Sequence, residues 1–225
     1  MLPLPSLTAQ AGRLVELGVH TIAGLTAAEL CAAAAAAGRR DGALLVVHPD
    51  RAPASRLAEL VEREGKRGFV VLDMTDVDAF TPTEHALLPD AQVYLVDGLE
   101  RGDEMLNWSP DEALPAITAR GRTPLTLGEG VHWLLQQPEA LERNRCFMTI
   151  GSRLRRPDGR LDARTPALWL SNGTGRDGRG RRGAPKIGWC WAGNRHTWLG
   201  FASAAGRAAV PVPTDENRRR PASVG

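Results

Sequence analysis

Apolar residues in the first forty positions recur at helical spacing. The pattern over residues 6–17 repeats near the 3.6-residue period and predicts a helix that ends before Gly18. Thr26-Ala-Ala-Glu29 has the spacing of a capping box, in which the threonine hydroxyl and the glutamate carboxylate satisfy free amides at a helix start. The alanines that follow have the highest helix propensity. Residues 1–38 are therefore predicted to form an N-terminal helical segment.

Short apolar runs alternate with an amphipathic segment in the next part of the chain. Strands are predicted over residues 43–48, 69–74 and 92–96, and a helix over residues 55–64. Strands linked by helical segments are typical of an α/β or α+β layer. No glycine-rich phosphate loop lies between these elements, so the pattern does not predict a nucleotide-binding fold.

Two further helices have clear start signals. Ser109-Pro-Asp-Glu112 places a serine at the N-cap, a proline at the first helical position and acidic residues in the first turn. Thr126-Leu-Gly-Glu129 repeats the capping-box spacing. Both segments are therefore predicted helices.

From Cys146 onward, the pattern changes to short apolar runs that are typical of strands. Four strands are predicted, over residues 146–150, 167–170, 186–191 and 196–201. Gly193 and Asn194 tolerate positive φ, so the last two strands are predicted to form a hairpin. The predicted class is α+β, with N-terminal helices, a central mixed α/β layer and a C-terminal antiparallel β-sheet.

The domain prediction follows from these elements. Residues 39–210 are predicted to form a single α+β domain after the helical segment. Basic segments at 153–164 and 172–182 interrupt the strand-rich half and have almost no apolar residues. The segment 211–225 has three prolines and no large apolar residue beyond valine, and it is predicted to be a disordered tail.

The composition favours a globular protein of the cytoplasm. The chain of 225 residues has a net charge of +2, which gives no global attraction to nucleic acid or membrane. Its three cysteines are widely spaced, which argues against a disulfide framework, and the N-terminus lacks the pattern of a secretory signal. Asp73, Asp76 and Asp78 match no known ion loop. We expect no cofactor, no metal and no membrane partner.

Four motifs carry a resemblance. They are Gly121-Arg-Thr-Pro-Leu-Thr-Leu-Gly-Glu-Gly130, Cys146-Phe-Met-Thr-Ile-Gly-Ser-Arg153, Pro166-Ala-Leu-Trp-Leu-Ser171 and Gly183-Ala-Pro-Lys-Ile-Gly-Trp-Cys-Trp-Ala-Gly-Asn-Arg-His-Thr-Trp-Leu-Gly200. Over roughly residues 40–206 the chain resembles an uncharacterised actinobacterial family known only as a domain of unknown function. The resemblance implies no activity, cofactor or catalytic residue. The two basic segments look like insertions relative to that family.

The last motif contains a candidate nucleophile and base, Cys190 and His196. Strand alternation, however, places Gly188 and Cys190 on one face and the neighbouring tryptophans on the other. Small residues on one face and large ones on the other are typical of a packed layer. A buried structural cysteine is therefore the first interpretation, and a hydrolase or transferase that uses Cys190 and His196 is the alternative.

The same motif favours a binding surface. Trp189, Trp191 and Trp198 could stack on a planar ligand, and Asn194 and Arg195 in the turn could contact its polar groups. The competing interpretation is that the tryptophans fill a β core. We predict a non-enzymatic binding or scaffold protein whose partner is an unidentified small molecule or protein.

A third interpretation concerns the arginines of the second basic segment. Gly-Arg segments bind phosphates in a salt-dependent way, so an anionic partner or weak nucleic-acid binding is the second alternative. A solvated loop is the competing interpretation. The arginines involved are Arg176, Arg179, Arg181 and Arg182.

Overall fold

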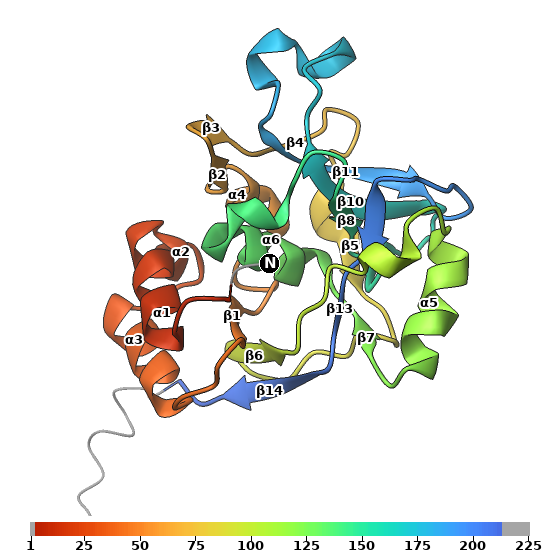
Figure 1. Cartoon of the computed structure of the whole chain (residues 1–225). Helices are drawn as coiled ribbons and strands as arrows, with labels where there is room; N and C mark the ends of the chain where they lie inside the picture. The colour runs from red at the N-terminus through yellow and green to blue at the C-terminus, as the bar shows by residue number, and fades with distance from the viewer. Residues whose placement is uncertain (1–2, 213–225) are drawn as a thin grey trace, which may run out of the picture.

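The computed structural model describes residues 3–212, and helix α6 (Leu127–Gln136) lies at its centre (Figure 1). The capping box predicted at Thr126 is present. Nine of the ten α6 residues are buried, and the helix contacts strands of both main sheets. A helix that is apolar on all sides belongs inside a core, and α6 has this character apart from its last residue, Gln136, and two polar residues discussed below. Gly130 allows close packing, since a Cβ there would lie 2.6 Å from Thr149 Cγ2.

The first sheet contains three antiparallel strands in the order β1-β6-β14. Their bounds are β1 (Leu44–Val47), β6 (Val93–Asp97) and β14 (Gly206–Val210). Every residue of β1 is buried, which explains its continuous apolar sequence. The C-terminal strand therefore pairs with the middle of the chain rather than with its sequence neighbours.

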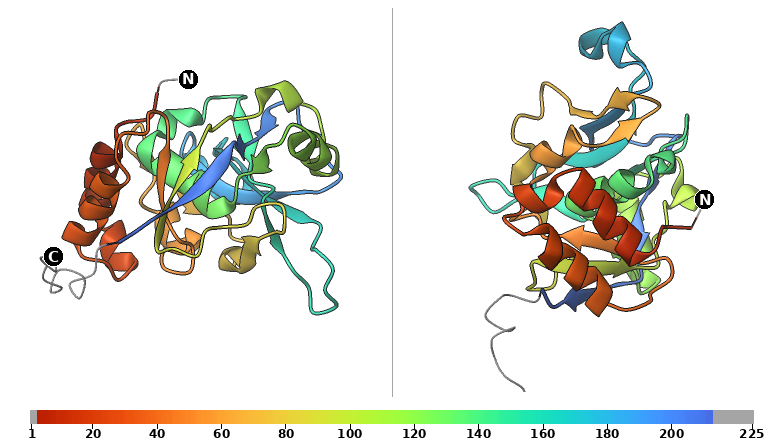
Figure 2. Two further views of the ribbon diagram at one scale, coloured as in Figure 1. Left: turned by 90° about the horizontal axis from the view of Figure 1, so that it is seen from below. Right: turned by 90° about the vertical axis from the view of Figure 1, so that its left-hand side faces the viewer.

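Three N-terminal helices cover one side of this sheet and lie together in two views (Figures 1 and 2). They are α1 (Leu7–Glu16), α2 (Val19–Ile22) and α3 (Ala27–Ala36). Leu14 and Leu30 join the same buried cluster as the strands and α6. Gln10 closes the free edge of β1, because its side-chain amide donates to Ala43 O and accepts from Leu45 N, both at 2.8 Å.

The second sheet has five strands in the order β12-β8-β10-β11-β4. Their bounds are β12 (Leu199–Phe201), β8 (Cys146–Met148), β10 (Arg164–Leu170), β11 (Pro185–Trp191) and β4 (Phe69–Val70). The three central strands are antiparallel, and the strand at each edge is parallel to its neighbour. The stacked rings of Trp133 and Phe147, 5.0 Å apart, join α6 to this sheet.

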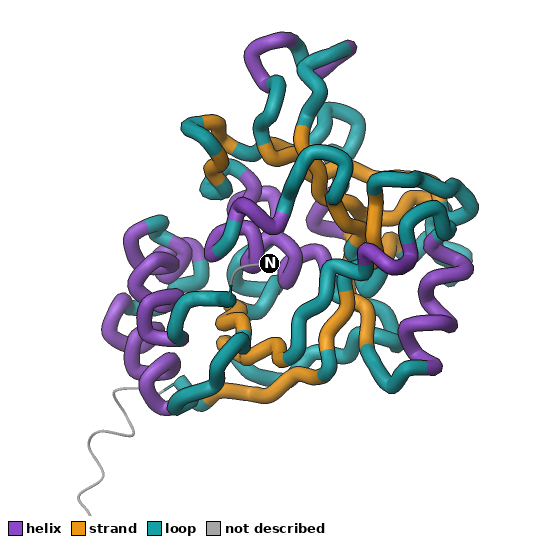
Figure 3. The backbone as a smooth tube through the Cα atoms, viewed as in Figure 1, coloured by secondary structure: helices purple, strands orange, loops and turns teal. Residues whose placement is uncertain are grey.

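The remaining elements are short apart from α5, and long connections surround the second sheet (Figure 3). The helices are α4 (Ala54–Ala58) and α5 (Pro110–Ala119), with 3-10 turns η1 (Val77–Ala79), η2 (Asp103–Met105), η3 (Pro138–Ala140), η4 (Gly175–Asp177) and η5 (Arg179–Arg181). The strands are β2 (Glu62–Arg63), β3 (Lys66–Arg67), β5 (Phe80–Pro82), β7 (Thr123–Pro124), β9 (Ser152–Leu154) and β13 (Ser203–Ala204).

The α+β class predicted from the sequence is confirmed, but the predicted hairpin in the Trp motif is wrong. Strand β11 pairs with β10 over seven residues, whereas β12 pairs with β8. Two strands therefore separate β11 from β12. Gly193 and Asn194 allow the chain to reverse direction but do not determine which strand pairs with β11. That choice depends on which strand can form hydrogen bonds with the backbone of β11 along its length.

Two other predicted elements are shorter than expected. The helix predicted over 55–64 ends at Ala58, and the strand predicted over 69–74 ends at Val70. Gly68 brings the chain back against α4, where a Cβ would lie 2.4 Å from Ala58 O. Of the tail predicted over 211–225, all but the first two residues lie outside the described residues.

A buried ion pair joins α6 to β14. Arg207 donates from Nε to Glu129 Oε1 at 2.5 Å and from Nη2 to Glu129 Oε2 at 2.8 Å. The Glu129 side chain is fully buried and that of Arg207 is 5% exposed. Tyr94 of β6 donates a third hydrogen bond to Glu129, and Arg207 also donates to Thr123 Oγ1 and Pro124 O. Burial, with the charge of Glu129 nearby, raises the pKa of Tyr94 well above 10.

His132, one turn further along α6, is held in its neutral form. Its Nε2 accepts the amide proton of Val47 at 3.2 Å, so its Nδ1 donates to Gly128 O at 2.8 Å. Burial lowers the pKa of His132 from 6.5 to about 4. The imidazole thus joins α6 to β1 only while it is neutral.

We expect Arg207→Met to lower the free energy of unfolding by about 3–5 kcal/mol, because it leaves the buried Glu129 carboxylate without its charge partner. Urea unfolding followed by circular dichroism would measure this. Arg13→Met, at an exposed position of α1, is the control and should change stability by less than about 0.5 kcal/mol. Equal effects of the two variants would contradict a structural role for the pair.

We also expect His132 to make stability pH-dependent. Because its folded pKa lies below its unfolded value, the unfolded chain binds more protons between pH 6.5 and 4. The contribution of His132 is therefore complete above pH 6.5 and falls by about 3 kcal/mol as the pH drops to 4. Urea titrations at steps of pH should show this loss, and His132→Gln should remove most of the dependence within that window. If the variant keeps the same pH profile, His132 is not the source of the pH-dependent stability.

Candidate functional site

A cavity of about 320 Å³ lies between four segments of the chain. They are the β2–β3 hairpin, the turn that precedes β8, the connection from the end of β10 to the start of β11, and Trp198 just before β12. The residues that line the cavity are Arg63, Glu64, Arg143, Asn144, Cys146, Trp169, Leu170, Ser171, Asn172, Gly183 and Trp198. This volume falls within the range of small-molecule sites.

Two tryptophans form the aromatic wall of the cavity. The rings of Trp169 and Trp198 are 6.1 Å apart and meet edge to face at 62°. Trp169 lies over Gly188 of the neighbouring strand, where a Cβ would be 2.4 Å from Trp169 Cη2. Both indoles are only partly buried, so part of each ring surface remains available to a ligand.

Two arginines supply the cationic wall. Arg63 lies in β2, 2.7 Å from Glu64, and its Nε is buried without a hydrogen-bond partner among the described residues. Arg143 is exposed in the turn before β8, and its guanidinium has no acidic partner within residues 3–212. The hairpin turn that presents Arg63 has positive φ at both Glu64 and Gly65, as the tight type I′ geometry requires.

Cys146 lies in β8 beside the cavity, and its thiol is not suited to nucleophilic attack. The Sγ donates to Glu142 O at 3.3 Å. Burial raises the pKa of Cys146 from 9.0 to about 11, so the thiol stays protonated near neutral pH. The cavity therefore combines rings and cations with an inert thiol, an arrangement suited to binding.

The structure separates the three tryptophans predicted to form one platform. Trp189 and Trp191 form an edge-to-face pair 4.6 Å apart, and alternation along β11 places both on the face opposite Cys190. Trp198 lies instead in the cavity with Trp169. Trp169 was missed as a site residue although it lies in the Pro166–Ser171 motif.

Cys190 lies in the sheet, whereas His196 lies in the loop between β11 and β12. Cys190 is in β11 and His196 precedes β12, with β8 and β10 between those strands. Burial raises the pKa of Cys190 from 9.0 to about 11, and burial lowers the pKa of His196. Neither shift comes from the other residue. His196 instead contacts Trp198, with ring centroids 5.4 Å apart.

The turn residues Asn194 and Arg195 are exposed and lie away from the cavity lining. Arg195 forms an ion pair with Glu112 at the start of α5 and donates to Asn107 O. Asn194 donates its backbone amide to Trp191 O. Arg195 therefore ties the turn to α5.

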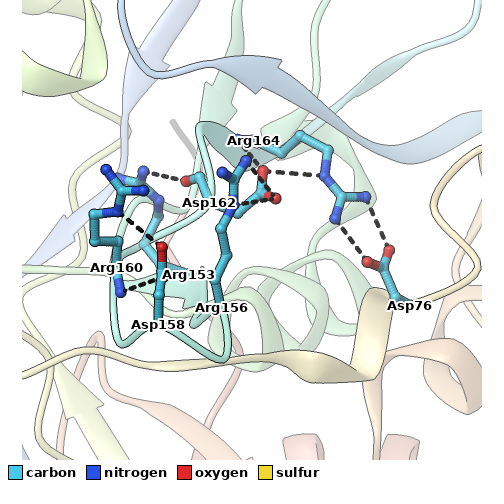
Figure 4. A network of polar contacts seen from close by, with 7 residues as sticks. All are labelled: Asp76, Arg153, Arg156, Asp158, Arg160, Asp162 and Arg164. Carbon is cyan, nitrogen blue, oxygen red and sulfur yellow. Dashed lines mark hydrogen bonds and ion pairs between the residues drawn. The ribbon is translucent and has the colours of Figure 1, made fainter.

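The first basic segment pairs its charges partly with its own aspartates and partly with Asp76 outside it (Figure 4). Residues 153–164 form the hairpin connection from β9 to β10, which extends away from the rest of the molecule (Figure 2). Asp162 accepts from Arg156 and Arg164, and Arg164 also makes a bidentate pair with Asp76 at 2.7 and 3.0 Å. A neighbouring carboxylate offsets the field of each paired arginine, so these arginines attract an external anion less strongly than unpaired ones would.

The second basic segment is attached differently. Residues 172–183 project beside the β2–β3 hairpin (Figure 1). Lys186 pairs with Asp177 at 2.7 Å, and Arg181 stacks over the Phe69 ring at 4.2 Å. Arg176 lies 3.8 Å from Asp73, whereas Arg179 and Arg182 have no acidic partner in the part of the chain that the structure describes. Asn172 and Gly183, at the base of this segment, line the cavity.

Residues 3–212 contain neither a candidate metal site nor a helix that could span a membrane. The acidic, histidine and cysteine side chains form no group of three or more that could hold a metal ion. Asp76 and Asp78 are engaged by Arg164 and Ser55 respectively. Within the same residues, every helix is too short or too polar to cross a bilayer.

The comparisons with known proteins yield a family. The model of a family of unknown function, DUF5701, matches residues 13–210, which is most of the chain. Comparison with curated proteins and with solved structures yields no match.

We expect iodoacetamide to label Cys31, which is exposed, well before Cys190 at pH 8. A pKa of about 11 reduces the thiolate fraction of Cys190 roughly 100-fold relative to the ordinary value of 9.0. Mass spectrometry of peptides from a labelling time course would give both rates, with the chain in urea as the unfolded reference. Labelling of Cys190 faster than in urea would support the alternative of a nucleophilic cysteine.

Proposed function

This chain belongs to the DUF5701 family of unknown function, and we propose that it is a non-enzymatic binding protein for a small anion that carries a planar ring. The observation that carries the proposal is the meeting of two indoles and two guanidiniums, from four segments of the chain, around one cavity of about 320 Å³. The proposed ligand surface is therefore the cavity lined by Trp198 and Trp169, and not the whole Trp motif that the sequence predicted.

The lining favours a ligand with both a ring and a negative charge. Partly exposed indoles stack on or edge against planar groups, and this interaction depends little on the identity of the ring. A guanidinium forms strong charge-assisted hydrogen bonds with phosphate or carboxylate. Arg143 is free to form such bonds, while Arg63 shares its charge with Glu64. Asn144 and Ser171 add polar groups that could orient the ligand.

The same lining argues against catalysis. General acid–base chemistry requires a titratable group near neutral pH within reach of the ligand. Among the described lining residues, the titratable candidates are the Cys146 thiol, which burial keeps protonated, and the Glu64 carboxylate beside Arg63. Catalysis by Cys190 and His196 remains an alternative that the labelling experiment addresses.

The test compares ring-bearing anions with neutral analogues of the same ring. AMP against adenosine and 1-naphthalenesulfonate against naphthalene-1-sulfonamide are suitable pairs, measured by quenching of tryptophan fluorescence and by calorimetry. We expect each anion to bind more tightly than its neutral partner. Arg143→Gln should weaken anion binding about tenfold or more, as expected for a lost hydrogen bond to a charged group, and leave neutral binding unchanged.

Two further variants control this experiment. Trp198→Phe should weaken the anion and its neutral analogue equally, because the ring contact is independent of charge. Arg13→Gln removes an exposed arginine of α1 that does not line the cavity, and it should change neither affinity. The proposal is wrong if no anion of the panel binds better than its neutral analogue, or if Arg143→Gln and Arg13→Gln behave alike.

A further inference from the structure

We infer that the cavity takes one base of a single-stranded nucleic acid and that the basic surface around it binds the phosphates of neighbouring nucleotides. This inference rests on the proposed function of the cavity and adds the class of its ligand. The surface, here named the basic rim, consists of residues 62–67, 142–145 and 172–183. Each of these segments contributes lining residues to the cavity, so all three meet there.

The basic rim has a strong excess of positive charge. It contains nine basic and four acidic residues, whereas the whole chain has a net charge of only +2. Three of the four acidic side chains are engaged: Glu142 with Arg101, Asp177 with Lys186, and Glu64 with Arg63. Five exposed arginines of the rim have neither an ion pair nor a ring contact within the described residues, whereas Arg181 stacks on Phe69. These five are Arg67, Arg143, Arg145, Arg179 and Arg182.

Two parts of the basic rim, the β2–β3 hairpin and the 172–183 segment, are held in place relative to each other and to the sheet. Lys66 Nζ donates to Arg182 O and so joins the β2–β3 hairpin to the 172–183 segment. Arg181 stacks on Phe69 of β4, next to the sheet. At the base of the segment, Asp177 accepts from Ser171 Oγ and Lys186 Nζ, both at 2.7 Å. The free guanidiniums therefore extend from a supported surface rather than from an unattached arm.

The number and position of these arginines favour a polyanion over a single small anion. Of the five free guanidiniums, that of Arg143 lines the cavity and the other four lie outside it. One monovalent ligand in the cavity could not engage them all. Phosphates of successive nucleotides, leading away from a base bound against the exposed surfaces of Trp169 and Trp198, would meet them in turn.

The position of the two indoles in the cavity favours a single strand over a duplex. A base inside a duplex is stacked and paired on both sides, and it would have to leave the helix to reach Trp169 and Trp198. In a single strand the base is free to enter, and base–aromatic stacking is tolerant of sequence. A bare polyanion such as an acidic peptide would use the arginines but would leave the aromatic wall without a partner.

The test uses the full chain and fluorescence anisotropy with a labelled 12-nucleotide oligo(U) or oligo(dT). We expect it to bind at least tenfold more tightly than the mononucleotide at about 50 mM salt, and more tightly than a duplex of equal length. A 12-residue poly-glutamate is the control for charge without bases and should bind at least tenfold more weakly. If four outer phosphates are contacted, the slope of log affinity against log salt should be about −3.

Variants then distinguish the contribution of the basic rim to binding from that of the cavity. Arg67→Gln/Arg179→Gln/Arg182→Gln should make the salt slope shallower by about 2 and leave mononucleotide binding unchanged, since none of the three lines the cavity. A triple variant at exposed arginines elsewhere, Arg13→Gln/Arg39→Gln/Arg160→Gln, is matched in charge and should retain the slope. Trp198→Phe and Trp198→Ala should each lower oligonucleotide affinity, the latter about tenfold, with thermal melting to verify the fold.

The results distinguish this inference from the proposed function of the cavity. If the mononucleotide binds in an Arg143-dependent way but the oligonucleotide binds no tighter, the proposed function stands and this inference is wrong. Equal binding of poly-glutamate, or equal loss in both triple variants, also overturns the inference, because charge alone would then account for binding. If neither mononucleotide nor oligonucleotide binds, the inference fails, and the remaining anions of the panel decide on the cavity.

Discussion

The ion pair between Glu129 and Arg207 is the interaction on which the arrangement of α6 depends. A carboxylate inside a fully buried helix is tolerated only when a charge and further hydrogen bonds compensate for the lost water. Arg207 supplies that charge from β14, 78 positions later, and Tyr94 supplies a hydrogen bond from β6. The pair therefore requires the C-terminal strand to complete the first sheet.

The position of the cavity follows from the same central helix. Trp133 of α6 packs on Phe147 of β8, and Gly130 allows the helix to lie close to the second sheet. With β8 held in this way, the neighbouring β10 carries Trp169, and Trp198 enters just before β12 on the other side of β8. A core contact thus determines where the two indoles of the candidate site meet, although α6 contributes no residue to the cavity lining.

The two basic segments have similar composition, but their arginines differ in how they are paired with carboxylates. In residues 153–164 the arginines pair with Asp158 and Asp162 of the same segment and with Asp76 of a neighbouring one (Figure 4). In residues 172–183 the aspartate is already engaged by Lys186, so Arg179 and Arg182 face solvent without acidic partners among the described residues. Net charge along the sequence does not distinguish these cases, because pairing depends on which carboxylate lies nearby in space.

The sequence by itself determined the features that depend on near neighbours. The helix starts at Thr26, Ser109 and Thr126 were predictable because a cap and its partner lie three residues apart, and short apolar runs indicated most of the strands. Only the tertiary structure decided the strand order, which overturned the hairpin between β11 and β12. It also decided the partners of Glu129 and the grouping of Trp169 and Trp198 with Arg63 and Arg143. These contacts join positions far apart in the chain, and no local spacing encodes which of several compatible strands or charges will meet.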